Sequence, residues 1–485
     1  MVQLSDSIKA FMKGMKHSKV SLTGAIITTV TFPILLVSVI LDLHGTIHNI
    51  YFGFITYLVL GPLFIAGLLL IFIGIFFFKG KEDIGLFTFA YLKDQFTSPD
   101  RFAKLRKLIF LITALTFANI FIIALTSYSG YHFTESVGFC AQFCHSAMEP
   151  EHTAYKNSPH SRVACVECHI GKGAEWFVKS KISGSRQLLA VATGNFSRPI
   201  ETPIHGLRPA RETCEECHRP ELFHGDKLKA IDKYLPDENN THVQTVLLMK
   251  IGSGGYRGAE AHGIHWHVSP DNQITYRHAD RGREQISEVT LSKADGTQLV
   301  FSSDEYTSEP RGENEHDAGS RLMDCIDCHN RPTHIYVGPN EALDHKLSHG
   351  EISQDLPYIK KMGYDLITQE YASQEEAKKS IATGLRTWYG RKYPELVAKQ
   401  MPLLEQAIAG VQAAYTENVF PEMRIGWNTY RNFLGHKDDS GCFRCHDDSH
   451  VTASGKTISQ DCDTCHIILA EEEENPEVLA NLAGY

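Results

Sequence analysis

The sequence predicts a membrane-anchored fold, in which three transmembrane helices precede an outer domain that is mostly α-helical or irregular and contains a small β insertion. The anchor is indicated by three early stretches without charged side chains, residues 21–41, 51–78 and 108–127. Each is long enough to cross a hydrocarbon core about 30 Å thick as a helix, which takes roughly 20 residues. Because a buried helix of a soluble protein usually carries polar residues along one face, we interpret residues 21–127 as a three-helix transmembrane anchor.

Basic residues beside the anchor predict its orientation. The leader 1–20 contains four lysines and the loop 79–107 contains seven lysines and arginines, whereas residues 42–50 contain neither. Lysine and arginine are enriched in cytoplasmic loops, so the leader and the 79–107 loop are expected to be cytoplasmic. The chain beyond about residue 128 is then on the opposite side. The first stretch is too long for a cleaved signal peptide, and we expect it to be retained.

The cysteines provide the third observation, because all twelve form close pairs and a histidine follows each pair directly. Five pairs have the spacing C-x-x-C-H, and the first, in GFCAQFCHSAMEP, has one more intervening residue. C-x-x-C-H is the attachment site of c-type haem, in which both thiols bond to the porphyrin and the histidine becomes an axial ligand of the iron. We therefore predict six covalently bound haem c groups. The residues concerned are Cys140, Cys144, His145, Cys165, Cys168, His169, Cys214, Cys217, His218, Cys325, Cys328, His329, Cys442, Cys445, His446, Cys462, Cys465 and His466.

Two other uses of paired cysteines fit this pattern less well. A structural zinc site combines two cysteine pairs around one ion and needs no histidine after each pair. Disulfide frameworks are typical of small secreted domains rather than of a chain of 485 residues. The sequence therefore predicts a membrane-anchored multihaem c-type cytochrome. Because c-type haem is attached on the outer face of the bacterial inner membrane, we expect that membrane as its location and a periplasmic haem domain.

The periplasmic part is expected to comprise four segments. Residues 128–225 contain the first three motifs, and residues 226–320 form a β-rich insertion. Residues 321–420 contain the fourth motif and a helical region, and residues 421–485 contain the last two motifs and an acidic tail.

Short patterns locate the expected strands and helices. THVQTVLLMKIG and ITYRHAD are strand-like, and SEVTLSKADGTQLVF is typical of a hairpin with Asp295 and Gly296 at its turn. In GIHWHVS, His265 and His267 are expected on one face of a strand. Ser373-x-x-Glu376 resembles a capping box at the start of a helix in the region 340–418.

The charge distribution narrows the range of partners. The formal net charge is −10, and residues 471–477 read EEEENPE. This tail is either a solvated terminus or a docking patch for a basic partner cytochrome. No basic patch interleaved with aromatic residues occurs, so nucleic acid is not expected as a partner.

Histidines outside the motifs are candidates for the second axial ligand of each iron. Nineteen of the 25 histidines remain once the motif histidines are set aside, which favours mostly bis-histidine haems of low potential. None of the three apolar stretches contains a histidine, so haem b in the membrane is not expected. Met148 is a candidate ligand of the first haem, or alternatively a packing residue. The histidine candidates are His160, His265, His267, His334, His436 and His450, with His152, His205 and His224 in reserve.

The run CHSAMEPEHTAYKNSPHSRVACVECHIGKGAEWFVKSK resembles the NapC/NirT/NrfH family of membrane-anchored multihaem quinol dehydrogenases, over roughly residues 108–220. The three-helix anchor and the later motifs look like the larger inner-membrane cytochromes of metal-reducing bacteria. The resemblance implies that the protein takes electrons from the quinone pool and passes them to periplasmic c-type cytochromes or a reductase. It also implies that Met148 ligates the first haem and that Lys172, Lys179 and Lys181 lie near the quinol. The sequence departs from the family in its longer first motif, its extra haem motifs and its extra helices.

The function predicted from these observations is oxidation of quinol, such as menaquinol, with transfer of electrons to periplasmic cytochromes in anaerobic or extracellular respiration. From chain order, the first haem is the expected entry and the last two are the expected exit. One alternative is a terminal reductase for nitrite, hydroxylamine or metal oxyanions, which needs an open position on one iron. No C-x-x-C-K motif, a variant found at one such site, occurs here. The other alternative is an electron-conduit subunit of a larger complex, in which another subunit oxidises the quinol.

Overall fold

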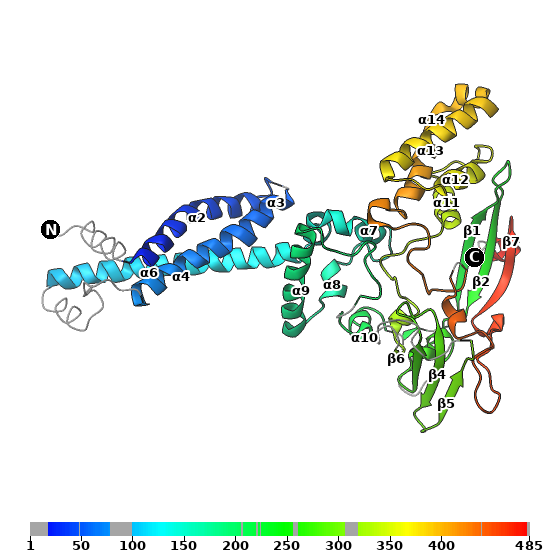
Figure 1. Cartoon of the computed structure of the whole chain (residues 1–485), viewed down its shortest axis with the longest axis horizontal. Helices are drawn as coiled ribbons and strands as arrows, with labels where there is room; N and C mark the ends of the chain where they lie inside the picture. Colours follow the sequence, from blue (N-terminus) through cyan, green and yellow to red (C-terminus); the bar gives the residue numbers. More distant parts are fainter. Residues whose placement is uncertain are drawn as a thin grey trace. The chain divides into compact units, whose positions relative to one another are not determined.

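The computed structural model describes residues 18–47, 49–77, 99–204, 207–219, 222–223, 225–255, 260–305, 319–437 and 439–482 (Figure 1). Most of the leader and most of the expected cytoplasmic loop lie outside these residues, as do His205 and His224. The chain divides into two compact units, residues 1–145 and 146–485. Each unit is described separately below.

The first unit contains three helices that are long and apolar enough to cross a membrane, at Lys19–Leu43, Ile50–Gly74 and Ile109–Thr134. They correspond to the three uncharged stretches of the sequence. The second runs through three consecutive helical segments without a break. The elements are α2 (Lys19–Leu43), α3 (Ile50–Gly53), the π-helical η1 (Phe54–Leu60), α4 (Gly61–Phe77) and α6 (Pro99–Thr134).

Small residues allow α2 and α4 to pack with their backbones in contact. A Cβ atom built at Gly24 would lie 2.6 Å from the carbonyl oxygen of Gly67. Helices in lipid gain little from burying apolar side chains against each other, so close backbone packing at small residues becomes the main attraction. The packing of this unit therefore fits a lipid environment better than a water-soluble bundle.

The second unit begins with the helices that surround the second and third motifs. They are α7 (His145–Lys156), α8 (Cys165–His169), α9 (Ala174–Ala192) and α10 (Ala210–Cys214). Almost none of the side chains between residues 165 and 219 is buried. This stretch is held by its loops and motif turns rather than by an apolar core.

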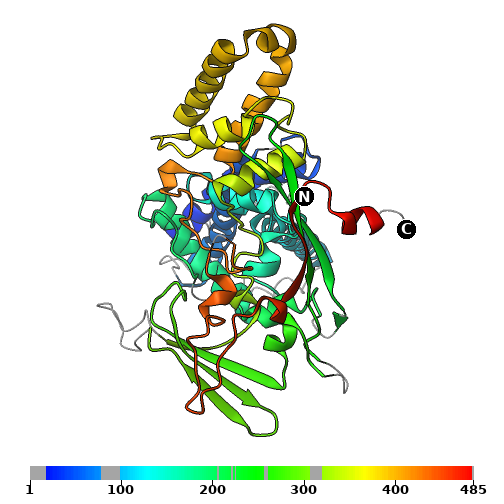
Figure 2. The same ribbon diagram turned by 90° about the vertical axis from the view of Figure 1, so that its right-hand side faces the viewer.

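Two antiparallel sheets follow, and one of them departs from the sequence prediction. The expected hairpin forms between β4 and β5, with Gly296 at φ +85° in its turn. The predicted β-rich insertion contains β1 to β5, but the first sheet has the order β1-β2-β7, and β7 starts at the sixth motif and runs into the acidic tail (Figures 1 and 2). Period-two alternation identifies a strand but not its partner. The strands are β1 (Lys227–Tyr234), β2 (His242–Met249), β3 (Asn272–His278), β4 (Ile286–Lys293), β5 (Gln298–Ser302), β6 (Gly319–Leu322) and β7 (His466–Glu473).

The segment GIHWHVS is also different from the prediction, because it forms a short 3-10 helix, η5 (Ile264–Val268), rather than a strand. At three residues per turn, residues two apart point in different directions. His265 and His267 therefore do not share one face.

The helical region contains the largest apolar core of the second unit. In both views it lies at the opposite end of this unit from the β5-β4-β3-β6 sheet (Figures 1 and 2). Ser373 caps α13 by accepting a hydrogen bond from the backbone N–H of Glu376, as the capping pattern predicted. The helices are α11 (Pro339–Ser348), α12 (Ile359–Ile367), α13 (Gln374–Lys392) and α14 (Pro394–Thr416).

Candidate haem and quinol sites

Each attachment motif lies in a tight helical turn that brings its thiols and imidazole together. The backbone N–H of His218 donates to the carbonyl of Cys214 at 2.8 Å, and His329 makes the same bond to Cys325 at 2.8 Å. All twelve cysteines lie within the described residues, and none is in a disulfide. The thiols are therefore available for attachment to haem.

The longer first motif begins in a π-helical segment, η3 (Phe139–Phe143), which contains Cys140 and is followed by Cys144 and His145. A π-helical turn closes over five residues instead of four. Cys140 and His145 are five apart, whereas the corresponding pair in each other motif is four apart. The wider turn accommodates the additional residue.

In the second unit, motifs that follow one another in the sequence also lie next to one another in space. The thiols of Cys214 and Cys325 share a hydrogen bond, which together with burial raises the pKa of Cys214. Burial raises the pKa of Cys328 to about 12, and the nearby Cys442 adds to the shift. The second and third motifs are also close, because burial, Glu167, Cys165 and, least of all, Cys217 raise the pKa of Cys168. The fifth and sixth motifs are close too, because burial and then Cys442 raise the pKa of Cys465.

Four of the motif histidines lie beside other histidines at the spacing that an iron requires. A metal–imidazole bond is about 2 Å long, so two imidazoles on opposite sides of one metal have ring centres about 6 Å apart. Burial, and then repulsion from His265 and His218, lower the pKa of His329, so His265 is the candidate partner of His329. These residues fit bis-histidine haem. The centroid distances are 6.1 Å for His169–His334, 5.9 Å for His218–His160, 5.8 Å for His446–His267 and 6.1 Å for His466–His436.

Backbone carbonyls orient several of these imidazoles. The Nδ1 atom of His160 lies 3.1 Å from the carbonyl oxygen of Pro332, and that of His265 lies 3.2 Å from the carbonyl of Ile251. His267 is held in the same way by the carbonyl of Ile264 at 2.8 Å. A carbonyl at Nδ1 fixes the proton there and leaves the lone pair of Nε2 for a metal.

His450 does not fit its predicted role as an axial ligand. It is fully buried, and its Nδ1 lies 2.9 Å from a carboxylate oxygen of Asp447. Its Nε2 lies 3.1 Å from the carbonyl oxygen of Ile286. Both partners are oxygen acceptors that lie against the two ring nitrogens, so an iron has no approach to either nitrogen. His450 is a structural histidine that joins the fifth motif loop to β4.

The predicted ligand of the first haem is not tested in this way. The first motif belongs to the first unit and Met148 to the second. Met148 is partly buried on α7, and the side chain of His145 lies outside the described residues. The role of Met148 therefore stays a prediction.

The three lysines predicted near the quinol do not converge. Lys172 pairs with Glu216 at 2.9 Å, in the loop before α9. Lys179 pairs with Glu175 at 2.6 Å on α9. The ammonium group of Lys181 lies 4.9 Å from the ring centre of Phe177. Since Lys179 and Lys181 are two apart on a helix, they point to different faces.

An apolar stripe on α9 was missed by the sequence interpretation. Val178, Ile182 and Leu189 are 54%, 63% and 66% exposed, which is unusual for aliphatic side chains on a helix of an otherwise folded unit. Their spacing of four and seven residues places them on one face. This spacing was visible in the sequence and could have identified the stripe.

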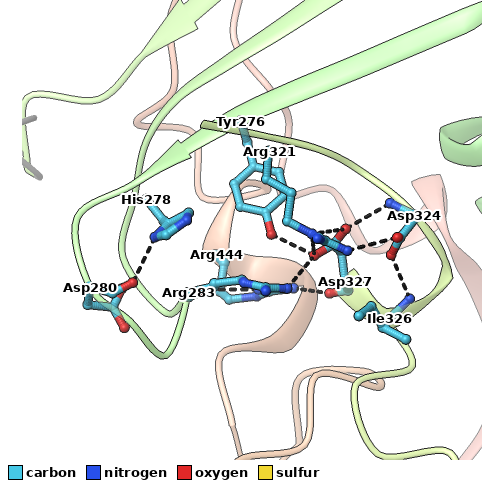
Figure 3. Close-up of polar contacts among 9 residues, drawn as sticks. All are labelled: Tyr276, His278, Asp280, Arg283, Arg321, Asp324, Ile326, Asp327 and Arg444. Carbon is cyan, nitrogen blue, oxygen red and sulfur yellow. Dashed lines mark hydrogen bonds and ion pairs between the residues drawn. The ribbon is translucent and has the colours of Figure 1, made fainter. Parts of the chain in front are cut away.

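A buried ion cluster surrounds Asp327, the second spacer residue of the fourth motif (Figure 3). The Asp327 carboxylate is 1% exposed. It accepts hydrogen bonds from the Tyr276 hydroxyl at 2.6 Å and from Nε of Arg321 at 2.9 Å, and Arg283 lies 3.3 Å away. Burial opposes the charge of Arg321, but Asp327 and then Asp324 raise its pKa above the usual value.

Arg444 extends this cluster to the fifth motif, where it is also the second spacer residue. Its guanidinium donates to the backbone carbonyl of Asp327 and, at 2.8 Å, to the carbonyl of Arg283 (Figure 3). The cluster thus joins two attachment loops. The sequence prediction made no use of the spacer residues, although their charges, in CIDCH and CFRCH, are the signal that could have identified the cluster.

Residues 103–202 match the model of the NapC/NirT cytochrome c family, N-terminal region. The chain is 39% identical to the cytochrome c-type protein ImcH of Geobacter sulfurreducens, over 95% of this chain and 90% of that protein. It is 28% identical to the cytochrome c-type protein NrfH of Wolinella succinogenes and 26% identical to TorY of Haemophilus influenzae, over 16% and 24% of this chain. These matches cover 44% of NrfH and 36% of TorY. No solved structure matches the chain.

Proposed function

This chain belongs to the NapC/NirT family of membrane-anchored c-type cytochromes, and from that premise we propose that it is a hexahaem quinol dehydrogenase of the bacterial inner membrane. It oxidises quinol, such as menaquinol, and passes electrons to periplasmic cytochromes. The observation that carries the proposal is the pairing of motif histidines with second histidines at 5.8–6.1 Å. Such pairs suit iron that exchanges electrons rather than iron that binds a substrate.

The axial ligands follow from these pairs. Haem would supply reversible one-electron oxidation and reduction at each site, and a histidine pair would fill both remaining ligand positions of its iron, so that little would rearrange between the two oxidation states. A terminal reductase would need an open position, and the histidine pairs of the second unit argue against one at those five motifs. We assign His169 with His334, His218 with His160, His329 with His265, His446 with His267 and His466 with His436, and Met148 is the proposed ligand of the first haem.

The membrane-facing element in this proposal is α9. Its apolar stripe of Val178, Ile182 and Leu189 suits burial in the interface of the bilayer, where a quinol head group would also lie. Lysines beside such a stripe can extend their charged ends toward water. Oxidation of a quinol releases two protons with two electrons, and the exposed Glu175 beside Lys179 can accept a proton. The N-terminus is cytoplasmic and the second unit periplasmic in this arrangement.

The exit is assigned to the last two motifs. The sixth motif leads directly into β7, which lies at the edge of the β1-β2-β7 sheet. Glu471, Glu472, Glu473 and Glu474 are exposed there. An acidic surface steers a basic partner toward the adjacent motif and accelerates encounter. A positively charged periplasmic c-type cytochrome is the partner that this surface suits.

The proposal is tested by mixing the purified protein anaerobically with menaquinol and following the haem α-band in a stopped flow. We expect rapid reduction. The triple variant V178S/I182S/L189S should be reduced at least about tenfold more slowly by menaquinol, since burial of each aliphatic side chain is worth more than about 1 kcal/mol. Reduction by dithionite should be unchanged. The matched control is V300S/L322S, which removes exposed aliphatic side chains from β5 and β6 of the second sheet.

Two results would contradict this function. If menaquinol fails to reduce a protein whose haems still accept electrons from dithionite, quinol oxidation belongs to another subunit and the chain is a conduit. If ferric high-spin haem is present and nitrite or hydroxylamine reoxidises the reduced protein catalytically, the chain is a terminal reductase.

A further inference from the structure

One of the proposed axial ligands, His334, has an environment that differs from that of the others. Its Nδ1 donates a hydrogen bond to the backbone carbonyl of Glu151 at 3.0 Å. A carboxylate oxygen of the same residue, Oε2, also lies 3.0 Å from Nδ1. His334 thus has both a neutral acceptor and an acidic side chain at the nitrogen that points away from the proposed iron.

The comparison with the other ligands makes this contact informative. His160, His265 and His267 each have a backbone carbonyl at Nδ1. These carbonyls carry only partial charge. A carboxylate at the outer nitrogen of a ligating histidine makes the imidazole a stronger electron donor to its metal. The electron-rich ligand stabilises the higher oxidation state of the metal.

Glu151 is also placed where its charge is poorly screened. Its side chain is 13% exposed. Arg331 is buried nearby and stacks on Tyr430, with its guanidinium 3.8 Å from the ring centre. Burial raises the pKa of Glu151, and the cation of Arg331 opposes that shift by favouring the carboxylate. The two residues form an oppositely charged pair beside one histidine ligand.

We propose that Glu151 is a positioning residue that lowers the redox potential of the haem held by His169 and His334. The proposal rests on the ligand assignment made above. A haem of lowered potential gives up its electron readily, so the second site of the series favours onward transfer to the third over retention. Glu151 achieves this by holding His334 in one tautomer and by placing negative charge beside it.

The experiment uses the full-length holoprotein in detergent at pH 8, titrated potentiometrically and followed by the α-band and by electron paramagnetic resonance. E151Q keeps the size of the side chain and an oxygen acceptor but removes its charge. We expect one of the six haems to become easier to reduce, with about a tenfold rise in its ratio of reduced to oxidised form at fixed ambient potential, which corresponds to about 59 mV for one electron. The low-spin signal of that haem should shift as well. The other five haems should be unchanged.

Three further variants make the result specific. E149Q removes an equal charge from an exposed position on the same helix and should move no potential. E151D, which restores the charge, should return the potential toward that of the wild type. R331Q removes the neighbouring cation and should shift the same haem in the opposite direction. This variant also preserves the test if E151Q incorporates less haem.

The variant H334A separates this inference from the ligand assignment. If H334A produces a high-spin ferric haem while E151Q and R331Q leave every potential unchanged, His334 is a ligand and the role of Glu151 is overturned. If H334A leaves every haem low-spin, the pairing itself is wrong. An equal shift of all six haems in E151Q would also overturn the inference, because it would indicate a general charge effect.

Discussion

The helical region α11–α14 and the stretch of motifs at residues 165–219 are organised in opposite ways. The helical region buries Ile381, Leu385 and Leu404 completely in one apolar core. Among the described residues of 165–219, Ala210 alone is buried. The first region has the side chains it needs to fold, whereas the second has thiols and imidazoles where a core would be. Its apolar contacts must therefore come from covalently attached haem, and its stability must depend on that attachment.

The largest effect is expected when attachment is prevented at the second motif. The double variant C165S/C168S should lose one haem per chain, and trypsin should cleave between residues 165 and 219 about tenfold faster or more, which corresponds to about 1.4 kcal/mol or more of local opening. Cleavage in α13 and α14 should be unchanged. Haem content and mass-spectrometric mapping of the fragments measure both. An unaltered cleavage pattern would mean that protein contacts alone hold this stretch.

The next-largest effect is expected at the ion cluster that connects the fourth and fifth motifs. D327N removes the charge that Arg321 and Arg283 share, and breaking a buried ion pair costs about 3–5 kcal/mol. Thermal unfolding of the haem region should occur at a lower temperature. Circular dichroism of the Soret band should also change, because the fourth and fifth haems would perturb each other's absorption less. Asp463 is an exposed spacer residue of the sixth motif, so D463N is the matched control and should have neither effect.

A variant in the apolar core of the helical region tests the same comparison from the other region. L385A leaves a cavity between α13 and its neighbours and should lower the free energy of unfolding of the helical region by about 2–5 kcal/mol. Far-ultraviolet circular dichroism during denaturation measures that loss. The haem content and the α-band should match those of the wild type. A loss of haem in this variant would show that the two regions fold as one unit and would break the comparison.

The same contrast explains which features were predictable from the sequence. Cysteine spacing predicts the attachment motifs because the chemistry of haem fixes that spacing locally, and uncharged stretches identify the apolar helices for a similar reason. The partners of His169 and His218 could not be derived, because His334 and His160 reach them through loop folding that has no periodic signal. His450 was misinterpreted since a histidine near a motif looks the same whether its nitrogens face iron or, as here, Asp447 and Ile286.

The predicted quinol lysines stay a prediction, and the structure adds only that their side chains have separate partners. A resemblance predicts which residue type occupies a position, but it does not predict the direction in which the side chain points. Lys179 and Lys181 are two apart on α9 and have different partners. The apolar stripe between them depends only on helical periodicity, so the sequence contained it. Strand β7 illustrates the remaining limit, because its pairing with β2 joins residues more than two hundred positions apart.

The smallest effect tests whether the conventionally folded part responds to acid as ordinary protein does. Asp237, in the turn between β1 and β2, accepts hydrogen bonds from the hydroxyl of Thr241 at 2.6 Å and from its backbone N–H at 2.8 Å. The hydroxyl bond, opposed by slight burial, holds the pKa of Asp237 below its usual value. A carboxyl with a depressed folded pKa stabilises the fold above its unfolded pKa of about 3.9. That contribution is lost as the pH falls through the folded pKa.

Replacement of the hydroxyl should therefore matter at neutral pH and not in acid. T241V should lower the free energy of unfolding by less than about 1 kcal/mol at pH 7, as is usual for an exposed charged group. The difference from the wild type should shrink as the pH falls through the depressed pKa of Asp237 and vanish once that carboxyl is protonated. In D237N, addition of T241V should produce no pH-dependent difference. Thermal unfolding at both pH values measures this, and a difference that persisted in acid would assign the effect of Thr241 to packing rather than to the charge of Asp237.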